Sequence, residues 1–252
     1  MQDISPWRPG PARPEITREE LHLWLARLDL PDQTVTLLYQ TLSPDEQERA
    51  RKLRFEEDKR RFVVARGALR AILGSYTGLP PAQVEFAYSP AGKPELAPEA
   101  GGTSASLSFN LSHSGEIALY AICRDRRVGI DIEMLRPRMA EEHIAERFFS
   151  PQEVDALRSM PPEDQVRAFF RCWTRKEAYV KARGEGLAIP LDPFVVTLRP
   201  NEPAALLDAG DENEQAVHWF LHAINVAPGY EAAVAVDSKP SLLRYWLFNF
   251  DT

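Results

Sequence analysis

Two long stretches of the chain combine apolar residues at helical spacing with charged residues between them. They cover residues 58–76 and 164–183, and a glycine follows each one within a few positions. Each stretch is preceded by a serine, a proline and an acidic first turn, which begin at Ser43 and Ser150 and are typical of a helix start. The pattern therefore predicts two long helices, each with another helix before it.

Shorter segments with the alternation or the apolar character of β-strands lie between and after these helices. They cover residues 84–88, 107–112, 117–123, 128–133 and 232–236. Helices and strands are interspersed along the chain, which predicts an α+β fold.

The second half of the chain repeats the order of the first half. The similar segments are Leu42–Glu46 and Phe149–Glu153, Gly78-Leu79 and Gly186-Leu187, and Ser114-Gly115 and Pro228-Gly229. Three similarities in one order indicate an internal duplication, although helix starts and strand entries also look alike by chance. We expect two similar halves, residues 1–124 and 125–252, each a small antiparallel sheet packed with a long helix.

The composition is that of an ordinary globular protein of 252 residues, with 44% hydrophobic and 27% charged residues. The net charge of −7 argues against general nucleic-acid binding. Two cysteines are too few for a disulfide framework, no apolar run is long enough to span a membrane, and residues 1–13 lack the apolar core of a signal peptide. We therefore expect a cytoplasmic protein that binds neither nucleic acid nor membranes.

The segment that begins at Val128 reads Val-Gly-Ile-Asp-Ile-Glu. Because successive side chains of a strand point to opposite faces, Asp131 and Glu133 share one face, with their Cα atoms roughly 6.6–6.8 Å apart. Two carboxylates at this separation can converge on a hard cation such as Mg²⁺. The alternative is a strand with one solvated face, and this segment alone favours that alternative.

The predicted helix over residues 164–183 carries Trp173, Glu177 and Lys181 on one face. It presents a carboxylate and an ammonium together, backed by an indole. The alternative is an ordinary glutamate–lysine pair worth ~0.2–0.5 kcal/mol of helix stability. Taken alone, this segment also favours the ordinary interpretation.

Taken together, the two segments resemble the signature of the 4′-phosphopantetheinyl transferase superfamily. Gly-x-Asp-x-Glu begins at Gly129, and Trp-x-x-Lys-Glu-Ala-x-x-Lys begins at Trp173, with every expected residue type present. The resemblance covers nearly the whole chain and is closest to the long, single-chain Sfp-type group. It implies two halves related by a pseudo-twofold, with coenzyme A in the cleft between them, and the duplication favours a monomer.

The resemblance implies transfer of the 4′-phosphopantetheine group from coenzyme A to a serine of an apo acyl or peptidyl carrier protein, with release of 3′,5′-ADP. It implies a Mg²⁺ ion, with Mn²⁺ as an alternative, held by Asp131, Glu133 and Glu177. Catalytic roles fall to Asp131, Glu177 and Lys181. Whether Glu177 takes the serine proton itself or binds the metal, with a bound water as the relay, stays open.

Further motifs of the family lie outside these two segments. The block around Ser112 and His113 matches residues that face the phosphates of coenzyme A, and Gly92-Lys93-Pro94 matches an element beside its adenine. The remaining assignments are Arg61 and Arg66 for the 3′-phosphate and Lys176 and Lys181 for charge near the diphosphate. Without the family, these segments are an ordinary polar turn, a tight turn and solvated helix faces.

Two other functions use the same residues. A magnesium-dependent hydrolase of coenzyme A or nucleotide diphosphates needs the same carboxylates but takes water as its acceptor. A non-catalytic relative binds the carrier protein or coenzyme A without turnover, although its acidic residues would be expected to decay first.

Overall fold

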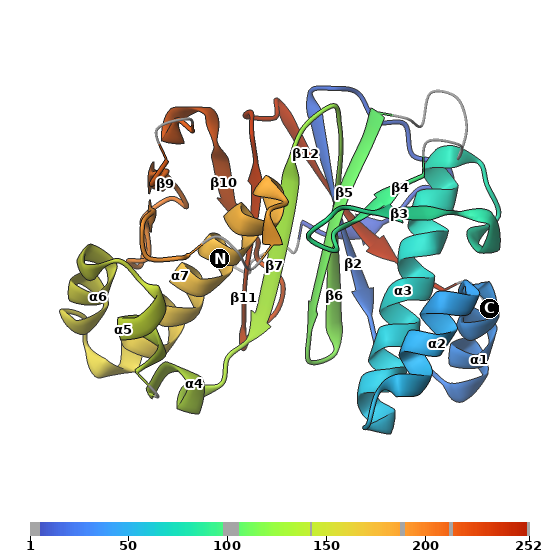
Figure 1. Ribbon diagram of the computed structural model, residues 1–252, viewed down its shortest axis with the longest axis horizontal. Coiled ribbons are helices and arrows are strands. Elements are labelled where there is room, and N and C mark those ends of the chain that lie inside the picture. The colour runs from blue at the N-terminus through green and yellow to red at the C-terminus, as the bar shows by residue number, and fades with distance from the viewer. Residues whose placement is uncertain (1–5, 98–105, 142, 187–189, 212–213, 251–252) are drawn as a thin grey trace. The chain divides into compact units, whose positions relative to one another are not determined.

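The structure is a computed structural model that describes residues 6–97, 106–141, 143–186, 190–211 and 214–250. Its internal contacts divide the chain into two compact units. Unit 1 draws its described residues from the ranges 1–87, 94–125 and 242–252, and unit 2 draws them from 88–93 and 126–241. Both units contain helices and small sheets, so the predicted mixture of helices and strands is confirmed (Figure 1).

Unit 1 is built on a five-stranded sheet with the strand order β1-β12-β2-β6-β5. The β1–β12 and β12–β2 pairs are parallel, and the β2–β6 and β6–β5 pairs are antiparallel. A two-stranded ribbon of β3 and β4 flanks the turn at residues 89–93. The elements are β1 (Arg8–Pro9), β2 (Glu20–Arg27), α1 (Asp32–Thr41), α2 (Pro44–Lys52), α3 (Glu56–Thr77), β3 (Phe86–Tyr88), β4 (Pro94–Leu96), β5 (Leu107–Ser114), β6 (Ile117–Arg124) and β12 (Leu242–Phe248), with a short 3₁₀ helix at Pro81–Gln83.

Helix α3 supplies much of the apolar core of unit 1. Leu69 and Leu73 are fully buried in a cluster that includes Tyr120 of β6. The Tyr120 hydroxyl donates a hydrogen bond to the Ala65 carbonyl (2.8 Å), so the one polar atom of this buried ring is satisfied. The helix ends at Gly78, whose φ of 76° is left-handed and suits a residue without Cβ.

Unit 2 is built on a three-stranded antiparallel sheet with the strand order β10-β11-β7. Helix α7 packs on β7 and β11. The elements are β7 (Val128–Met134), α4 (Pro137–Glu141), α5 (Ile144–Phe148), α6 (Pro151–Arg158), α7 (Pro162–Arg183), β8 (Val195–Val196), β9 (Leu206–Asp208), β10 (Phe220–Ala223) and β11 (Tyr230–Val236), with a short 3₁₀ helix at Ala216–His218.

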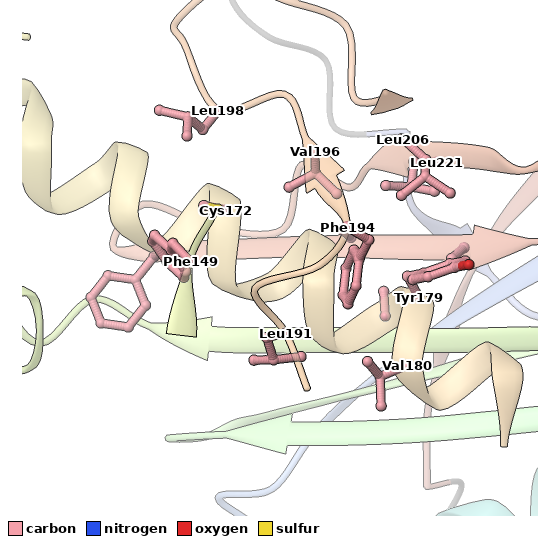
Figure 2. Close-up of a cluster of buried hydrophobic side chains, with 14 of the residues drawn as sticks. Phe149, Cys172, Tyr179, Val180, Leu191, Phe194, Val196, Leu198, Leu206 and Leu221 are labelled. Carbon is pink, nitrogen blue, oxygen red and sulfur yellow. The ribbon is translucent and has the colours of Figure 1, made fainter. Parts of the chain in front are cut away.

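The core of unit 2 surrounds α7, and Figure 2 shows part of it. Tyr179 and Cys172 of the helix are fully buried, and the Tyr179 ring meets the ring of Phe194 edge-on with centroids 4.9 Å apart. Val196 and Leu206, from the β8–β9 ribbon, belong to the same cluster. The long helix is therefore held by apolar contacts from several later segments of the chain.

The two units contain similar buried ion pairs at corresponding positions. In unit 1, Glu46 belongs to the capping box of α2 and pairs with Arg70 of α3 at 2.6 Å. In unit 2, Glu153 belongs to the capping box of α6 and pairs with Lys176 of α7 at 2.7 Å. All four side chains are at most 2% exposed, so each pair is a component of its core.

Each buried cation also donates to the carbonyls of the segment that follows its helix. Arg70 donates to Pro81 O and Val84 O, and Lys176 donates to Leu191 O and Phe194 O. Buried charges are tolerated when they are paired and hydrogen-bonded in this way. Because the same arrangement occurs twice along the chain, it supports the internal duplication.

The order of elements is duplicated as well. A strand (β2 or β7) precedes a set of helices, which ends in a helix of 22 residues (α3 or α7). Two further strands follow (β5 and β6, or β10 and β11), and the three strands pair antiparallel as β2-β6-β5 and β7-β11-β10. Each unit therefore contains three strands that pair antiparallel and one helix of 22 residues.

Three details of the prediction need correction. The expected division after residue 124 misses that β12 pairs with β2 and completes the sheet of unit 1, and that residues 88–93 belong to unit 2. The sheet of unit 1 is mixed, because β12 joins it in parallel. The helix-ending counterpart of Gly78 is Gly184, which has the same φ of 76°, whereas Leu187 lies outside the described residues.

The long helices and the five predicted strands are all present, with ends shifted by a few residues. Strands β2, β10 and β12 were not predicted. Six of the eight residues of β2 are buried, so it lacks the alternation of a half-buried strand. Among the described residues, no helix is both long and apolar enough to cross a membrane.

Candidate active site on strand β7 and helix α7

The site begins with an unusually close approach between β7 and α7. A Cβ atom built on Gly129 would lie 2.1 Å from Ala178 O and 2.3 Å from Ala182 N. Only a residue without a side chain fits there, because real Cβ atoms essentially never approach heavy atoms this closely. The glycine of the Gly-x-Asp-x-Glu segment is therefore required for the packing of the helix on the strand.

Asp131 lies two residues further along the same face of β7 and is 3% exposed. Its Oδ1 accepts a hydrogen bond from Lys181 Nζ at 2.6 Å, a charge-assisted contact between strand and helix. The opposite face of the strand is apolar, since Val128, Ile130 and Ile132 are buried as predicted. The structure thus brings together two residues from the separate segments of the signature.

Glu133 follows on the same face and is 21% exposed. Its Oε2 accepts a hydrogen bond from Arg136 at 3.0 Å. Across the strand pair, Glu133 lies opposite Glu231 of β11, whose Oε1 accepts a hydrogen bond from Arg167 of α7 at 2.6 Å. Two like charges directly opposite each other are unfavourable, so the arginines that bind each carboxylate offset this repulsion.

Glu177 lies on α7, one turn before Lys181, and is half-buried. Burial raises the pKa of its carboxyl, the charges of Asp131 and Glu133 raise it further, and the nearby Lys181 ammonium lowers it. Asp131, Glu133 and Lys181 therefore all lie close enough to act on the carboxyl of Glu177 within unit 2. The structure places all four predicted residues of the reaction centre together.

The three carboxylates do not converge closely enough in this structure to form a metal site. Within the described part of the chain, no group of three histidine, cysteine, aspartate or glutamate side chains is arranged closely enough to hold a metal ion. Asp131 and Glu133 instead contact the cations Lys181 and Arg136. In donor type the set fits Mg²⁺, because all three candidate ligands are carboxylate oxygens.

Lys176, the other lysine of the signature, lies away from this set of charges. It is fully buried, and its ammonium contacts Glu153 and two carbonyls in the core. Trp173 is half-buried between Phe169, with which it stacks at 6.0 Å, and Phe148, which it meets edge-on at 5.8 Å. Lys176 therefore contributes an ion pair and hydrogen bonds to the core of unit 2, and Trp173 contributes aromatic contacts.

The predicted phosphate contacts of unit 1 differ in how accessible they are. Arg61 pairs with Glu57 on the surface of α3, and its side chain is 27% exposed. Arg66 is buried beside Glu46 and lies over the ring of Phe86 at 4.4 Å. Its guanidinium therefore binds the same buried carboxylate as Arg70, a contact that sequence reasoning did not anticipate.

Ser112 and His113 lie near the end of β5 in unit 1, Ser112 half-buried and His113 exposed. Gly92 has a φ of 81° and lies in the turn between β3 and β4. Lys93, in the same turn, donates hydrogen bonds to Val128 O at 2.9 Å and to Lys181 O at 2.8 Å. The Gly-Lys-Pro element thus contacts the backbone of the strand and the helix that carry the acidic residues.

Sequence reasoning did not assign Arg136 to the site, although its position three residues after Glu133 made a contact between them possible to foresee. It also did not foresee that Glu231 would lie opposite Glu133. That contact depends on the register of β11 against β7, which no local motif specifies.

The family profiles match both halves of the chain. The profile described as the 4′-phosphopantetheinyl transferase superfamily matches residues 127–235, and the profile described as 4′-phosphopantetheinyl transferase, N-terminal, matches residues 31–124. The first match covers the strand and the helix that carry the acidic residues.

Similar proteins bear related names. The 4′-phosphopantetheinyl transferase HetI of Nostoc sp. is 42% identical over 240 residues, which are 95% of this chain and 97% of that protein. The 4′-phosphopantetheinyl transferase Sfp of Bacillus subtilis is 30% identical over 77% of this chain and 81% of its own length. A solved holo-[acyl-carrier-protein] synthase of Thermotoga maritima has a TM-score of 0.34 at 20% identity, over 44% of this chain and 62% of that one.

The chain belongs to the 4′-phosphopantetheinyl transferase superfamily, with the Sfp-type resemblance confirmed. It is an enzyme that transfers 4′-phosphopantetheine from coenzyme A to a carrier protein.

Proposed function

We propose that Asp131, Glu133, Glu177 and Lys181 form the reaction centre of this transferase, with Mg²⁺ as the cofactor. The main support is that strand β7 and helix α7 bring the four side chains together, through the Lys181–Asp131 contact of 2.6 Å and the effect of the Asp131 and Glu133 charges on the pKa of Glu177. A carboxyl group whose pKa is raised and that lies beside a lysine is a frequent feature of catalytic centres.

Asp131, Glu133 and Glu177 are the residues that would hold the metal. When bound, Mg²⁺ supplies positive charge to the diphosphate oxygens of coenzyme A and so lowers the cost of the charge that develops on the leaving group. Mn²⁺, which accepts the same oxygen donors, is the alternative ion.

Lys181 is placed to act on the same diphosphate. Its side chain is 29% exposed while the ammonium contacts Asp131, so the lysine is not enclosed in the core. An ammonium near the oxygens of a phosphate offsets their negative charge as the serine hydroxyl approaches. Lys181 therefore orients and neutralises the diphosphate, and Asp131 holds the lysine in place.

Glu177 is the group best suited to take the proton from the serine hydroxyl. Its raised pKa, which results from burial and from Asp131 and Glu133, makes it a stronger base than a free glutamate. A ligand bound tightly to a metal would lose this basicity, so the two roles predict different behaviour. The dependence of kcat on pH in Glu177→Gln, measured together with metal binding, separates them. If the pH profile of kcat loses its acidic limb in Glu177→Gln while the affinity for metal is retained, the result supports Glu177 as the base.

Cofactor contacts of coenzyme A are assigned to exposed or half-buried residues that carry the family motifs. These are Arg61, Gly92, Pro94, Ser112 and His113. The core positions of Lys176 and Arg66 support a structural role for those two cations. The acceptor is an apo acyl or peptidyl carrier protein, and its serine is the nucleophile.

We also propose that the enzyme is a cytoplasmic monomer that acts without nucleic acid or membrane. Both cysteines, Cys123 and Cys172, are buried free thiols, as is usual in a reducing compartment. The net charge of −7 disfavours nucleic acid and anionic membrane surfaces. Light scattering of the purified protein at working concentration, with a mass of one chain expected, tests the oligomeric state.

The experiment that tests the reaction centre follows two products in one incubation with coenzyme A. Mass spectrometry measures the carrier protein with the added arm, and chromatography measures 3′,5′-ADP, with and without apo carrier. Removal of divalent ions with a chelator is expected to stop both products, and Mg²⁺ or Mn²⁺ to restore them. Unchanged transfer after chelation contradicts the metal assignment, and 3′,5′-ADP formed without carrier shows hydrolysis.

A further inference from the structure

The turn at residues 89–93 is the part of the chain between β3 and β4, yet by its contacts it belongs to unit 2. Ser89 organises it, because its carbonyl accepts from Gly92 N at 2.8 Å and its hydroxyl accepts from Lys93 N at 3.1 Å. Gly92 adopts the left-handed φ that the turn requires. The turn therefore presents the side chain of Lys93 in a defined direction.

The first acceptor of Lys93 is a carbonyl that the sheet of unit 2 leaves unused. In the β7–β11 pair, Asp237 N donates to Arg127 O and Leu135 N donates to Gly229 O. Antiparallel pairing alternates, so the odd-numbered residues of β7 bond to β11, and Val128 O points away from it. Strand β7 ends the strand order of its sheet, and Lys93 Nζ meets Val128 O at this side, at 2.9 Å.

The second acceptor is a carbonyl in the last turn of α7. The last four carbonyls of a helix lack partners within the helix. Gly184 N donates to Val180 O, and Lys93 Nζ donates to Lys181 O at 2.8 Å. A cation at this end of a helix also interacts favourably with the helix dipole.

Together with the Lys181–Asp131 contact, these two hydrogen bonds link β7 to α7. Lys93 joins the beginning of β7 to the backbone of Lys181, and the Lys181 ammonium joins the helix to Asp131. Between these contacts, Gly129 lies directly against the helix backbone. The spacing between strand and helix is thus fixed on both sides of the glycine.

We infer that Lys93 is a positioning residue for the transfer reaction, which sets the separation of β7 and α7 and thereby the placement of Lys181 and Glu177 relative to Asp131. The inference rests on the proposed reaction centre. It differs from the role that the family resemblance gives to Lys93, because a side chain occupied by two carbonyls of unit 2 acts on the transfer through other residues.

The two roles predict different kinetics. A positioning residue lowers kcat when it is removed, because a displacement of about 1 Å in a reaction centre can cost on the order of a hundredfold in rate. A contact to coenzyme A raises KM and Kd for coenzyme A instead. For Lys93→Met we expect a tenfold to hundredfold loss of kcat, with Kd for coenzyme A changed by less than about twofold.

The experiment compares Lys93→Met, Lys93→Arg and the matched control Lys239→Met, which replaces an exposed lysine of the same unit. Calorimetry with coenzyme A gives Kd and the fraction of binding-competent protein, to which kcat for an apo carrier protein is normalised. Arginine retains a long cationic donor and is expected to recover most of kcat, while Lys239→Met is expected to match the wild type. If Lys93→Met does not fold, Lys93→Gln takes its place.

An increase in Kd for coenzyme A with kcat unchanged overturns the inference and makes Lys93 a cofactor contact. Wild-type kcat in Lys93→Met overturns it as well. Asp131→Asn, measured in the same series, keeps the two proposals distinguishable. If Asp131→Asn is inactive while Lys93→Met is normal, only the positioning role fails, and if Asp131→Asn is fully active, the assignment of the reaction centre fails.

Discussion

Replacement of Gly129 by alanine tests the packing on which the reaction centre depends. The added Cβ would lie 2.1 Å from Ala178 O, whereas an ordinary contact begins at 3.4 Å. The clashing atoms, Ala178 O and Ala182 N, belong to the helix backbone, so no side chain can move aside. Strand β7 and helix α7 must therefore separate by about 1 Å. We expect this to destabilise the protein by about 1–3 kcal/mol and to lower kcat by on the order of a hundredfold.

Gly229→Ala is the matched control. Gly229 has a φ of 83°, so alanine is strained there by about 1–2 kcal/mol, but its Cβ would meet no atom within 4 Å. Both variants are measured by urea unfolding and by transfer to an apo carrier protein under saturating coenzyme A. Similar losses of stability, with kcat lowered only in Gly129→Ala, are expected. Wild-type kcat in Gly129→Ala, or an equal loss of kcat in both variants, refutes the reasoning.

Three further predictions concern the buried groups and the site. Lys176→Met leaves the carboxylate of Glu153 buried without its cation and is expected to lower the free energy of unfolding in urea by about 3–5 kcal/mol. Adding Glu153→Gln is expected to recover most of this loss, and unchanged stability would contradict the structural role. Burial lowers the pKa of His22 to about 4 from an ordinary 6.5, so the folded protein favours the neutral imidazole. The free energy of unfolding is therefore expected to be highest above pH 6.5 and to fall by up to about 3 kcal/mol as the pH falls toward 4. His22→Gln should remove this part of the acid sensitivity. Arg136→Ala removes the hydrogen bond that Arg136 donates to Glu133, and a rise in the apparent affinity for Mg²⁺ is expected in a titration of activity. No change in this affinity would show that the contact has no influence on the ion.

Much of the fold was predictable because local rules and burial agree. The capping boxes at Ser43 and Ser150 and the glycines that end the long helices are local signals, and all of them mark real helix ends. The pairing of β12 with β2 was not predicted, because it joins residues near the two ends of the chain. Such pairing has no signature in either segment alone.

The acidic residues of the site were predictable from periodicity, because Asp131 and Glu133 share a strand face and Glu177 and Lys181 share a helix face. The roles of the cations were not. Lys176 and Lys181 are five residues apart on one helix, yet the first is fully buried beside Glu153 and the second reaches Asp131. Only the packing of the helix determines which lysine faces the core.

The assignment of Asp131 and Glu177 to the reaction centre is tested most directly by the mass of an apo carrier protein after incubation with coenzyme A and Mg²⁺. Asp131→Asn and Glu177→Gln are compared with the wild type and with Asp155→Asn, which changes an exposed carboxylate on α6. The added phosphopantetheine arm is expected at the wild-type rate with Asp155→Asn and at least about a hundredfold more slowly with the other two variants. Transfer at the wild-type rate by either folded variant would contradict the account.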